Sequence, residues 1–239
     1  MPIIRPALSR LAYLSSRLAT AAFSDRATVK DVAYMDAKSK FTKVYEDNIF
    51  GGADSRSGEG SNLEQTRAVR KELPKLLADL KITTMLDAPC GDWNWMRETD
   101  LGSTKYTGVD IVEPLIESNR AKYSSPTVQF ACLDIANADL PKVDLIFSRD
   151  CLVHLSFEDA FKVLRNFQRS GATYLLTTTF TNRKSNADLG KRFWRPLNKQ
   201  ISPFNFPAPL RTINERCTEG GGSFGDKSLG LWALKDLLV

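Results

Sequence analysis

Three aspartates in this sequence stand where a carboxylate could hold a ligand. Asp87, Asp110 and Asp134 each come at the end of a short apolar run. Because the carboxyl ends of parallel strands meet at one edge of a sheet, where α/β proteins bind ligands, we expect the three to share a crevice. The two oxygens of Asp110 match two neighbouring ribose hydroxyls. Asp134 could accept from a purine amine, with Ile135 packing on the ring. The spacing therefore predicts a nucleoside-binding site.

The turn after the first of these runs lies in the stretch LDAPCGDWNW, residues 86–95. Gly91 lacks a Cβ, so a ligand could approach the backbone closely there, at the start of a helix whose amides attract negative charge. We expect Asp87 and Gly91 to contact or closely approach the ligand, and Trp93 to form a wall of its site.

A fourth apolar run ends in Ser148, Arg149 and Asp150, and His154 follows four residues later. His154 is the only histidine, and its intrinsic pKa suits a general base near neutrality. Asp150 could orient His154 or bind an acceptor hydroxyl itself. Asp150 and His154 are therefore the candidate catalytic residues. The alternative is that His154 is a structural residue at the start of a helix.

These positions require alternating strands and helices, which favour an α/β fold with a parallel sheet covered on both faces. The last two strands have no helix between them, so we expect an antiparallel hairpin at the sheet edge. The expected strands are 82–86, 106–109, 128–132, 143–147, 174–178, 210–213 and 229–234.

Helices are expected between the strands. Ser61 and Glu64 have the spacing of a capping box, in which each side chain satisfies an amide of the first turn, and Pro74 should kink or split the helix that follows. Ser156 has the character of a helix N-cap. The expected helices follow residue 61, begin near Asp92, cover 113–122 and follow Ser156.

The strand ends resemble those of the class I S-adenosylmethionine-dependent methyltransferases. Asp87 to Gly91 is similar to the first motif, a D-x-P-C-G form in which Pro89 and Trp93 replace two glycines of the family pattern. Asp110, the pair Asp134-Ile135 and VDLIFSRD at 143–150 are similar to the next three motifs. The resemblance covers roughly 60–239. It implies a Rossmann-like, doubly wound, mostly parallel seven-stranded sheet with a C-terminal antiparallel β-hairpin.

The resemblance also implies S-adenosylmethionine as cofactor. Thr66 and Arg70 lie one turn apart on the helix before the first strand, which covers the cofactor in related enzymes, and an arginine suits its carboxylate. The cofactor-binding residues expected on this basis are Thr66, Arg70, Asp87, Ala88, Pro89, Gly91, Trp93, Asp110, Ile111, Asp134, Ile135, Ser148 and Arg149.

The activity implied is methylation of a small-molecule or saccharide acceptor, on oxygen in preference to nitrogen. The alternatives are an N-methyltransferase for a small amine and a non-catalytic module that binds S-adenosylmethionine. A nicotinamide-dependent oxidoreductase would need G-x-G-x-x-G in the first turn, which is absent. Residues 180–209 are expected to cover the substrate; their basic and aromatic side chains would suit an anionic or sugar-like acceptor.

Composition favours a single domain over 26–239 after a basic arm at 1–25. The net charge is +5, and residues 1–26 contribute four arginines against one aspartate. The rest of the chain is therefore nearly neutral, and nucleic acid is not the expected partner.

The basic arm resembles a transit peptide but could also lie on a membrane or pack on the domain. We expect no metal site, no transmembrane segment and a cytoplasmic location, or an organelle if the arm is a targeting signal. The oligomeric state is not set by the sequence.

Overall fold

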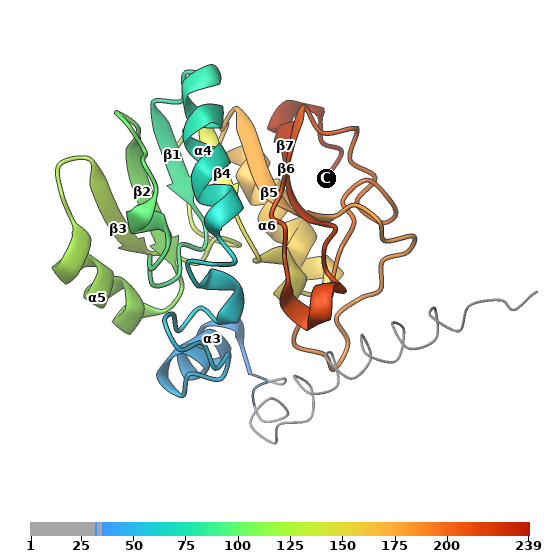
Figure 1. Ribbon diagram of the computed structural model, residues 1–239, viewed down its shortest axis with the longest axis horizontal. Helices are drawn as coiled ribbons and strands as arrows, with labels where there is room; N and C mark the ends of the chain where they lie inside the picture. Colours follow the sequence, from blue (N-terminus) through green and yellow to red (C-terminus); the bar gives the residue numbers. More distant parts are fainter. Residues whose placement is uncertain (1–31, 33–34) are drawn as a thin grey trace, which may run out of the picture.

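The computed structural model describes Val32 and residues 35–239, so the basic arm lies outside the described residues. Seven strands form one sheet in the order β3-β2-β1-β4-β5-β7-β6 (Figure 1). The strands are β1 Thr84–Asp87, β2 Lys105–Asp110, β3 Val128–Cys132, β4 Leu145–Ser148, β5 Tyr174–Phe180, β6 Arg211–Asn214 and β7 Lys227–Ala233.

The first five strands pair in parallel, and β7 runs antiparallel to both β5 and β6. This confirms the predicted doubly wound sheet with its C-terminal antiparallel hairpin. Each strand begins within three residues of its expected start, because an apolar run between turns is a strong signal for a buried strand.

Both faces of the sheet are buried, and successive residues of a strand serve opposite faces. Met85 packs in one apolar core with α4 (Arg67–Asp79) and α5 (Glu113–Tyr123). Its neighbour Leu86 packs in a second core with α6 (Phe157–Arg169). In Figure 1, α4 accordingly lies in front of the sheet and α6 behind it.

Two predicted details of α4 are wrong. The helix begins at Arg67, whereas Ser61 belongs to a short 3₁₀ helix, Glu59–Ser61, so no capping box forms. Pro74 does not split the helix, which continues to Asp79 because its apolar stripe is buried against the sheet. The N-cap of α6 is as predicted, since the Ser156 hydroxyl accepts from the amide of Asp159.

The helix expected near Asp92 is also absent. Gly91 and Trp93 have φ angles of +56° and +57°, in the left-handed region, which a right-handed helix cannot accommodate. The chain instead makes turns and a single 3₁₀ helix, Met96–Glu98.

The connection between β5 and β6 contains no helix or strand, yet it is anchored by buried aromatic residues such as Phe193, Phe204 and Phe206.

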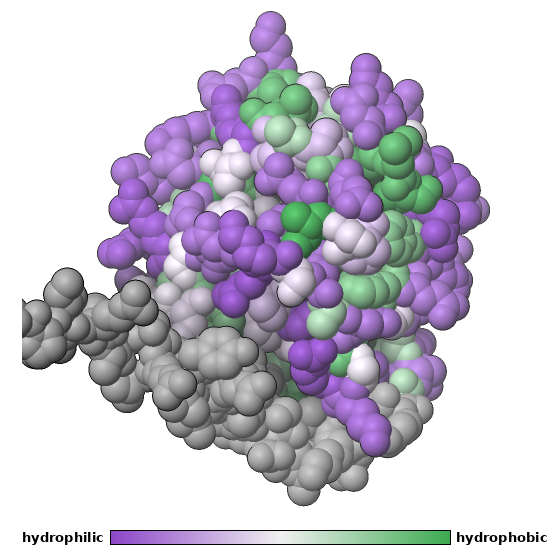
Figure 2. All heavy atoms as spheres, turned by 90° about the vertical axis from the view of Figure 1, so that its right-hand side faces the viewer, coloured by the Kyte–Doolittle hydropathy of each residue, from purple (hydrophilic) through white to green (hydrophobic). Residues whose placement is uncertain are grey.

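On the side of the molecule that carries the C-terminal strands, the surface is mostly hydrophilic, with hydrophobic atoms in separate groups (Figure 2). Among the described helices, none has the length and apolar character needed to cross a bilayer.

Candidate cofactor and acceptor site

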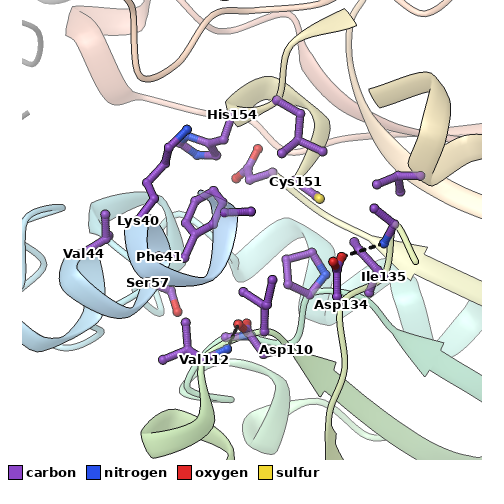
Figure 3. A pocket seen from close by; sticks show the side chains of 18 of the residues that line it. Lys40, Phe41, Val44, Ser57, Asp110, Val112, Asp134, Ile135, Cys151 and His154 are labelled. Atoms are coloured by element: carbon purple, nitrogen blue, oxygen red, sulfur yellow. Dashed lines mark hydrogen bonds between the residues drawn. The ribbon is translucent and has the colours of Figure 1, made fainter. Parts of the chain in front are cut away.

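A cavity of about 740 Å³ opens at the carboxyl edge of the sheet. Its floor comes from the segments that follow β1, β2, β3 and β4. Its cover comes from α3 (Ala37–Glu46) and the loop 51–61. Figure 3 shows Asp110 and Asp134 on one side of this space, and Lys40 and Phe41 of α3 with His154 on another. The volume is in the range of cofactor and small-molecule sites.

Asp110 is held by backbone amides at the end of β2. Its Oδ2 accepts from the amide of Gly91 at 3.2 Å and its Oδ1 from that of Val112 at 3.1 Å. Burial raises the pKa of Asp110 to about 6, although these amides work in the opposite direction. Each oxygen keeps acceptor capacity, and the residue lines the cavity, so two adjacent hydroxyls could donate to it.

Asp87 lines the same cavity and accepts from the Tyr106 hydroxyl at 2.7 Å. Burial raises its pKa to about 8, opposed by that hydrogen bond and reinforced by the charge of Asp110. Asp87 is therefore largely protonated at neutral pH, and a cation bound beside it would favour its ionised form.

The loop 51–61 lies directly over Gly91. A Cβ added to Gly91 would overlap the Ser57 hydroxyl, so a larger residue at this position would have to push Ser57 aside. Asp92 fastens the loop: its carboxylate accepts from the Ser55 hydroxyl at 2.9 Å and from the amide of Arg56 at 2.8 Å. Arg56 and Ser57 thereby reach the cavity, which sequence reasoning missed because the loop showed only a glycine- and serine-rich composition.

Asp134 and Ile135 line the cavity beyond β3, with Ile111 at the end of β2. The Asp134 carboxylate already accepts from the amide of Ala136 at 2.9 Å and from the Asn137 side chain at 2.6 Å (Figure 3 draws the first bond). It is thus fixed in orientation, and its remaining lone pairs are available to a ligand.

Trp93 does not wall the cavity, contrary to the prediction. Its ring packs in the core against Tyr106, Tyr123 and Phe130, with ring centroids 5.1–5.6 Å apart. The left-handed backbone at Trp93 turns the side chain beneath the loop instead of into the site. The space expected for Trp93 is lined instead by Trp95.

Four other predicted residues are also absent from the cavity lining: Thr66, Arg70, Ala88 and Ser148. The Thr66 hydroxyl and the Arg70 guanidinium donate to backbone carbonyls upstream, which ties the start of α4 together. Ala88 and Ser148 are fully buried at the ends of β1 and β4. The other predicted cofactor residues, Asp87, Pro89, Gly91, Asp110, Ile111, Asp134, Ile135 and Arg149, do line the cavity.

His154 lines the opposite part of the cavity, within an aromatic group. Its Nδ1 lies 2.7 Å from the carbonyl oxygen of Phe193. Since a carbonyl only accepts, Nδ1 carries the proton and Nε2 is the basic nitrogen of the neutral ring. The Phe50 ring centroid lies 5.2 Å from that of His154. Burial lowers the pKa of His154 to about 4, so the ring is neutral at pH 7.

Asp150 forms ion pairs rather than a bond to the histidine. Its Oδ2 accepts from Lys227 at 2.6 Å and lies 3.4 Å from Arg149. Its backbone amide donates to the Thr178 hydroxyl at 2.8 Å. Although burial opposes ionisation, these cations lower the pKa of Asp150 to about 2. No hydrogen bond from Asp150 to His154 is found among the described residues, so the predicted orienting role is not seen in this structure.

Sequence reasoning missed α3 as a cover. Its N-cap Asp36 accepts from the amide of Ser39, and Val44 is buried in a small core with Phe193. Phe41 and Lys40 of the same helix reach the cavity. The sequence did contain a signal for this helix, because Phe41, Val44 and Tyr45 have helical spacing after an aspartate.

The basic residues of the predicted cover segment 180–209 do not line the cavity. Arg195 is buried and donates to the Leu152 carbonyl at 2.8 Å, and Arg183 contacts Asp226 at 3.4 Å. Only Asp188, Leu189 and Gly190 of this segment line the cavity, so it brings no cation to an anionic acceptor.

In the described part of the chain, no group of His, Cys, Asp and Glu side chains forms a candidate metal site.

Residues 85–171 match a family model described as a methyltransferase domain. No curated protein matches the chain. Among solved structures, 1,6-didemethyltoxoflavin-N1-methyltransferase from Burkholderia thailandensis, bound to 1,6-didemethyltoxoflavin and S-adenosylhomocysteine, is similar with a TM-score of 0.57 and 16% identity over 97% of this chain and 92% of that one.

Two further structures are similar. Human N-acetylserotonin methyltransferase in complex with S-adenosylmethionine has a TM-score of 0.58 and 13% identity over 95% of this chain and 67% of that one. N-methyltransferase NodS from Bradyrhizobium japonicum, bound to S-adenosylhomocysteine, has a TM-score of 0.56 and 13% identity over 80% of this chain and 98% of that one.

At these identities the solved structures establish the fold, which is that of S-adenosylmethionine-dependent methyltransferases. The family match runs over residues 85–171, from β1 to the end of α6, and agrees with the expected methyltransferase activity. The cofactors named in the three structures agree with the predicted S-adenosylmethionine. The identity of the acceptor is a separate question.

Proposed function

We propose that the chain transfers a methyl group from S-adenosylmethionine to a hydroxyl of a small-molecule or saccharide acceptor. The observation that carries the proposal is the position of Asp110, a buried carboxylate at the end of β2 that is fixed by two backbone amides and lines the cavity. Asp110 lies within the residues that match the methyltransferase-domain model. The two oxygens of this carboxylate match the two neighbouring hydroxyls of a ribose, which would donate to them.

The cavity fits the rest of the cofactor as well. Ile111 and Ile135 would pack on the adenine, with Asp134 beside its amine. The amino-acid end would lie near Gly91, which lines the cavity beside the Ser57 hydroxyl packed on it. Arg56 would take the role that the sequence suggested for Arg70, because it lines the cavity. Its Nη1 donates to the carbonyl of Tyr45 at 2.8 Å, which fixes the guanidinium.

The sulfonium of the cofactor would supply the reactive methyl group. The chain would align the acceptor and exclude water, which is where most of the rate enhancement in such a displacement arises. Burial lowers the pKa of His154 to about 4, so its Nε2 is a weaker base than its intrinsic pKa suggested. As a neutral ring, it would still take the proton from the acceptor hydroxyl as oxygen gains the methyl group. Asp150, held ionised by Lys227 and Arg149, would accept a hydrogen bond from the acceptor.

N-methylation of a small amine is the second candidate. It is supported by the names of two similar structures, an N1-methyltransferase and an N-methyltransferase. His154 could receive a proton from an amine as well as from a hydroxyl. A module that binds the cofactor without turnover is the third candidate.

Calorimetric titration with S-adenosylmethionine tests the first step. We expect Asp110→Asn and Asp110→Ala to weaken binding by roughly tenfold or more, since a hydrogen bond to a charged group contributes about 1.5–3 kcal/mol. Asp139→Ala is the matched control, because Asp139 is exposed and does not line the cavity. An absence of binding by the wild type, or wild-type affinity in both Asp110 variants, would refute the proposal.

Methyl transfer is then measured from the tritium-labelled cofactor to a panel of hydroxyl and amine compounds. Label in hydroxyl products supports the proposal, and label in amine products alone supports the second candidate. Cofactor binding without transfer to any compound in the panel favours the non-catalytic module.

A further inference from the structure

A buried group of charges lies behind the acceptor end of the cavity. At its centre is Lys227 of β7, which is 4% exposed and does not itself line the cavity. Its Nζ lies 2.6 Å from Asp150, 3.6 Å from Glu215 and 3.9 Å from Glu219. The C-terminal hairpin therefore reaches a loop of the parallel half of the sheet through one ammonium group.

Arg149 completes this charge group. Its Nε and Nη2 donate to Glu215 at 3.1 and 2.7 Å, and Nη2 also donates to the carbonyl of Gly60 at 2.8 Å. Two buried cations thus face two acids, the buried Glu215 and the partly exposed Asp150. Removing one member of such a set leaves an uncompensated charge, so each holds the others in place.

Asp150 is the member that meets the cavity. Its side chain is 24% exposed, while Lys227 binds one oxygen and the Thr178 hydroxyl lies 3.3 Å from the other. The backbone of Asp150 has a φ of +53°, in the left-handed region that a residue with a side chain seldom adopts. Contacts on several sides must therefore keep the residue in this conformation.

We propose that Lys227 is a positioning residue for the methyl acceptor: it fixes the Asp150 carboxylate at the cavity wall, where that carboxylate receives a hydroxyl or amine donor of the acceptor. The inference rests on the proposed function and makes it more specific. An acceptor group at this position must be a hydrogen-bond donor, and a carboxylate or phosphate there would be repelled by Asp150.

His154 provides a reporter that needs no acceptor, because it is the only histidine in the sequence. The charges that act on it come from separate elements. Asp150 after β4 raises its pKa, while Arg195 of the β5–β6 connection and Lys227 of β7 lower it. Lys40 of α3 also lines this part of the cavity.

The experiment follows the titration of His154 by NMR in tag-free protein with ¹⁵N-labelled histidine. We expect Lys227→Met to raise the midpoint by about one pH unit, because an unclamped and uncompensated carboxylate can turn to the ring. Lys227→Arg keeps the cation and should stay close to wild type, whereas Asp150→Asn should lower the midpoint.

The decisive comparison repeats Lys227→Met in the Asp150→Asn background. If Lys227 acts through Asp150, Lys227→Met should raise the midpoint of the His154 titration in the Asp150→Asn background by less than half as much as in the wild-type background. The proposal would be overturned if Lys227→Met raised the His154 midpoint equally in the two backgrounds, or raised it in neither. Should Lys227→Met fail to fold, Lys227→Gln takes its place, since it removes the positive charge that compensates Asp150 while its amide can still donate to Glu215.

Titration of each variant with S-adenosylmethionine separates the two proposals. Lys227→Met should bind the cofactor within twofold of wild type, because Lys227 does not line the cavity. A wild type that fails to bind overturns the proposed function even when the NMR coupling is present. With an acceptor from the methyl-transfer panel, Lys227→Met should raise KM for that acceptor at least fivefold, and Lys227→Arg should restore it.

Discussion

At the scale of single residues, Asp87 is an acid buried where its charge is costly. Its pKa of about 8 in the fold exceeds the ordinary value of 3.8, mainly through burial. A group whose pKa rises on folding gives stability that is complete below its unfolded pKa and is lost as pH rises through its folded pKa. As pH rises from about 4 to about 8, Asp87 should therefore progressively reduce the free energy of unfolding of the wild type.

Asp87→Asn should remove this dependence, because an asparagine carries no charge and can still accept from the Tyr106 hydroxyl. We expect the variant to melt at a higher temperature than wild type at pH 8, with the difference fading towards pH 4. A gain of about 1 kcal/mol corresponds to about 2–4 °C in a chain of this size. Melting curves across this pH range measure it, with Asp139→Asn as an exposed control. A difference that is the same at every pH would show that the charge of Asp87 is not the cause.

The residues that could be predicted from the sequence share one property: they follow an apolar run directly. Asp110 and Asp134 reach the cavity because the end of a buried strand fixes where the next residue lies. Trp93 could not be placed, because its left-handed backbone depends on the loop packed above it. Lys227 could not be linked to Asp150, since their contact is set by the pairing of β7 with β5.

At the scale of elements, the strands were predictable and the pieces that cover the cavity were not. Strand positions depend on local apolar patterns. The loop 51–61 is positioned by the long-range bonds of Asp92 to Ser55 and Arg56, which leave no trace in local sequence. The close approach of this loop to Gly91 can be tested directly.

Gly91 and Gly102 form a matched pair, with φ angles of +56° and +57°. A Cβ at Gly91 would overlap the Ser57 hydroxyl, whereas a Cβ at Gly102 would meet nothing within 4 Å. Both alanine variants carry the same backbone strain, of order 1 kcal/mol. Gly91→Ala should lose about 1–3 kcal/mol more, because it must displace the loop as well. It should also weaken binding of S-adenosylmethionine, while Gly102→Ala should not.

Urea unfolding and calorimetric titration of the two variants provide the measurements. The double variant Gly91→Ala with Ser57→Gly removes the overlapping hydroxyl and should recover part of the lost stability. If Gly91→Ala and Gly102→Ala prove equally stable, the loop does not pack on Gly91 as described.

At the scale of the whole molecule, the cavity is closed by segments from distant parts of the chain. A small core joins Val44 of α3 and Ile49 to Phe193 of the β5–β6 connection. The Phe193 carbonyl in turn accepts from His154. This core is much smaller than the two cores that flank the sheet, although Phe41 and Tyr45 of α3 also pack against the core that contains Met85, so the cover rests on fewer apolar contacts than the sheet does. Local opening of the cover should therefore require less free energy than global unfolding.

Hydrogen exchange with and without S-adenosylhomocysteine tests this arrangement. At a hundred times its Kd, a ligand that binds only the folded state stabilises it by about 2.7 kcal/mol. We expect exchange in α3, in the loop 51–61 and after β1 and β2 to slow by up to this amount, because the bound nucleoside would join cover and floor. Amides of β5 and β7, which exchange through global unfolding, should slow only by the global stabilisation. Asp110→Ala at the same ligand concentration should show weaker protection, because a tenfold higher Kd reduces the stabilisation to about 1.4 kcal/mol. Slowing confined to the sheet, with α3 unchanged, would mean that the cover does not close on the cofactor.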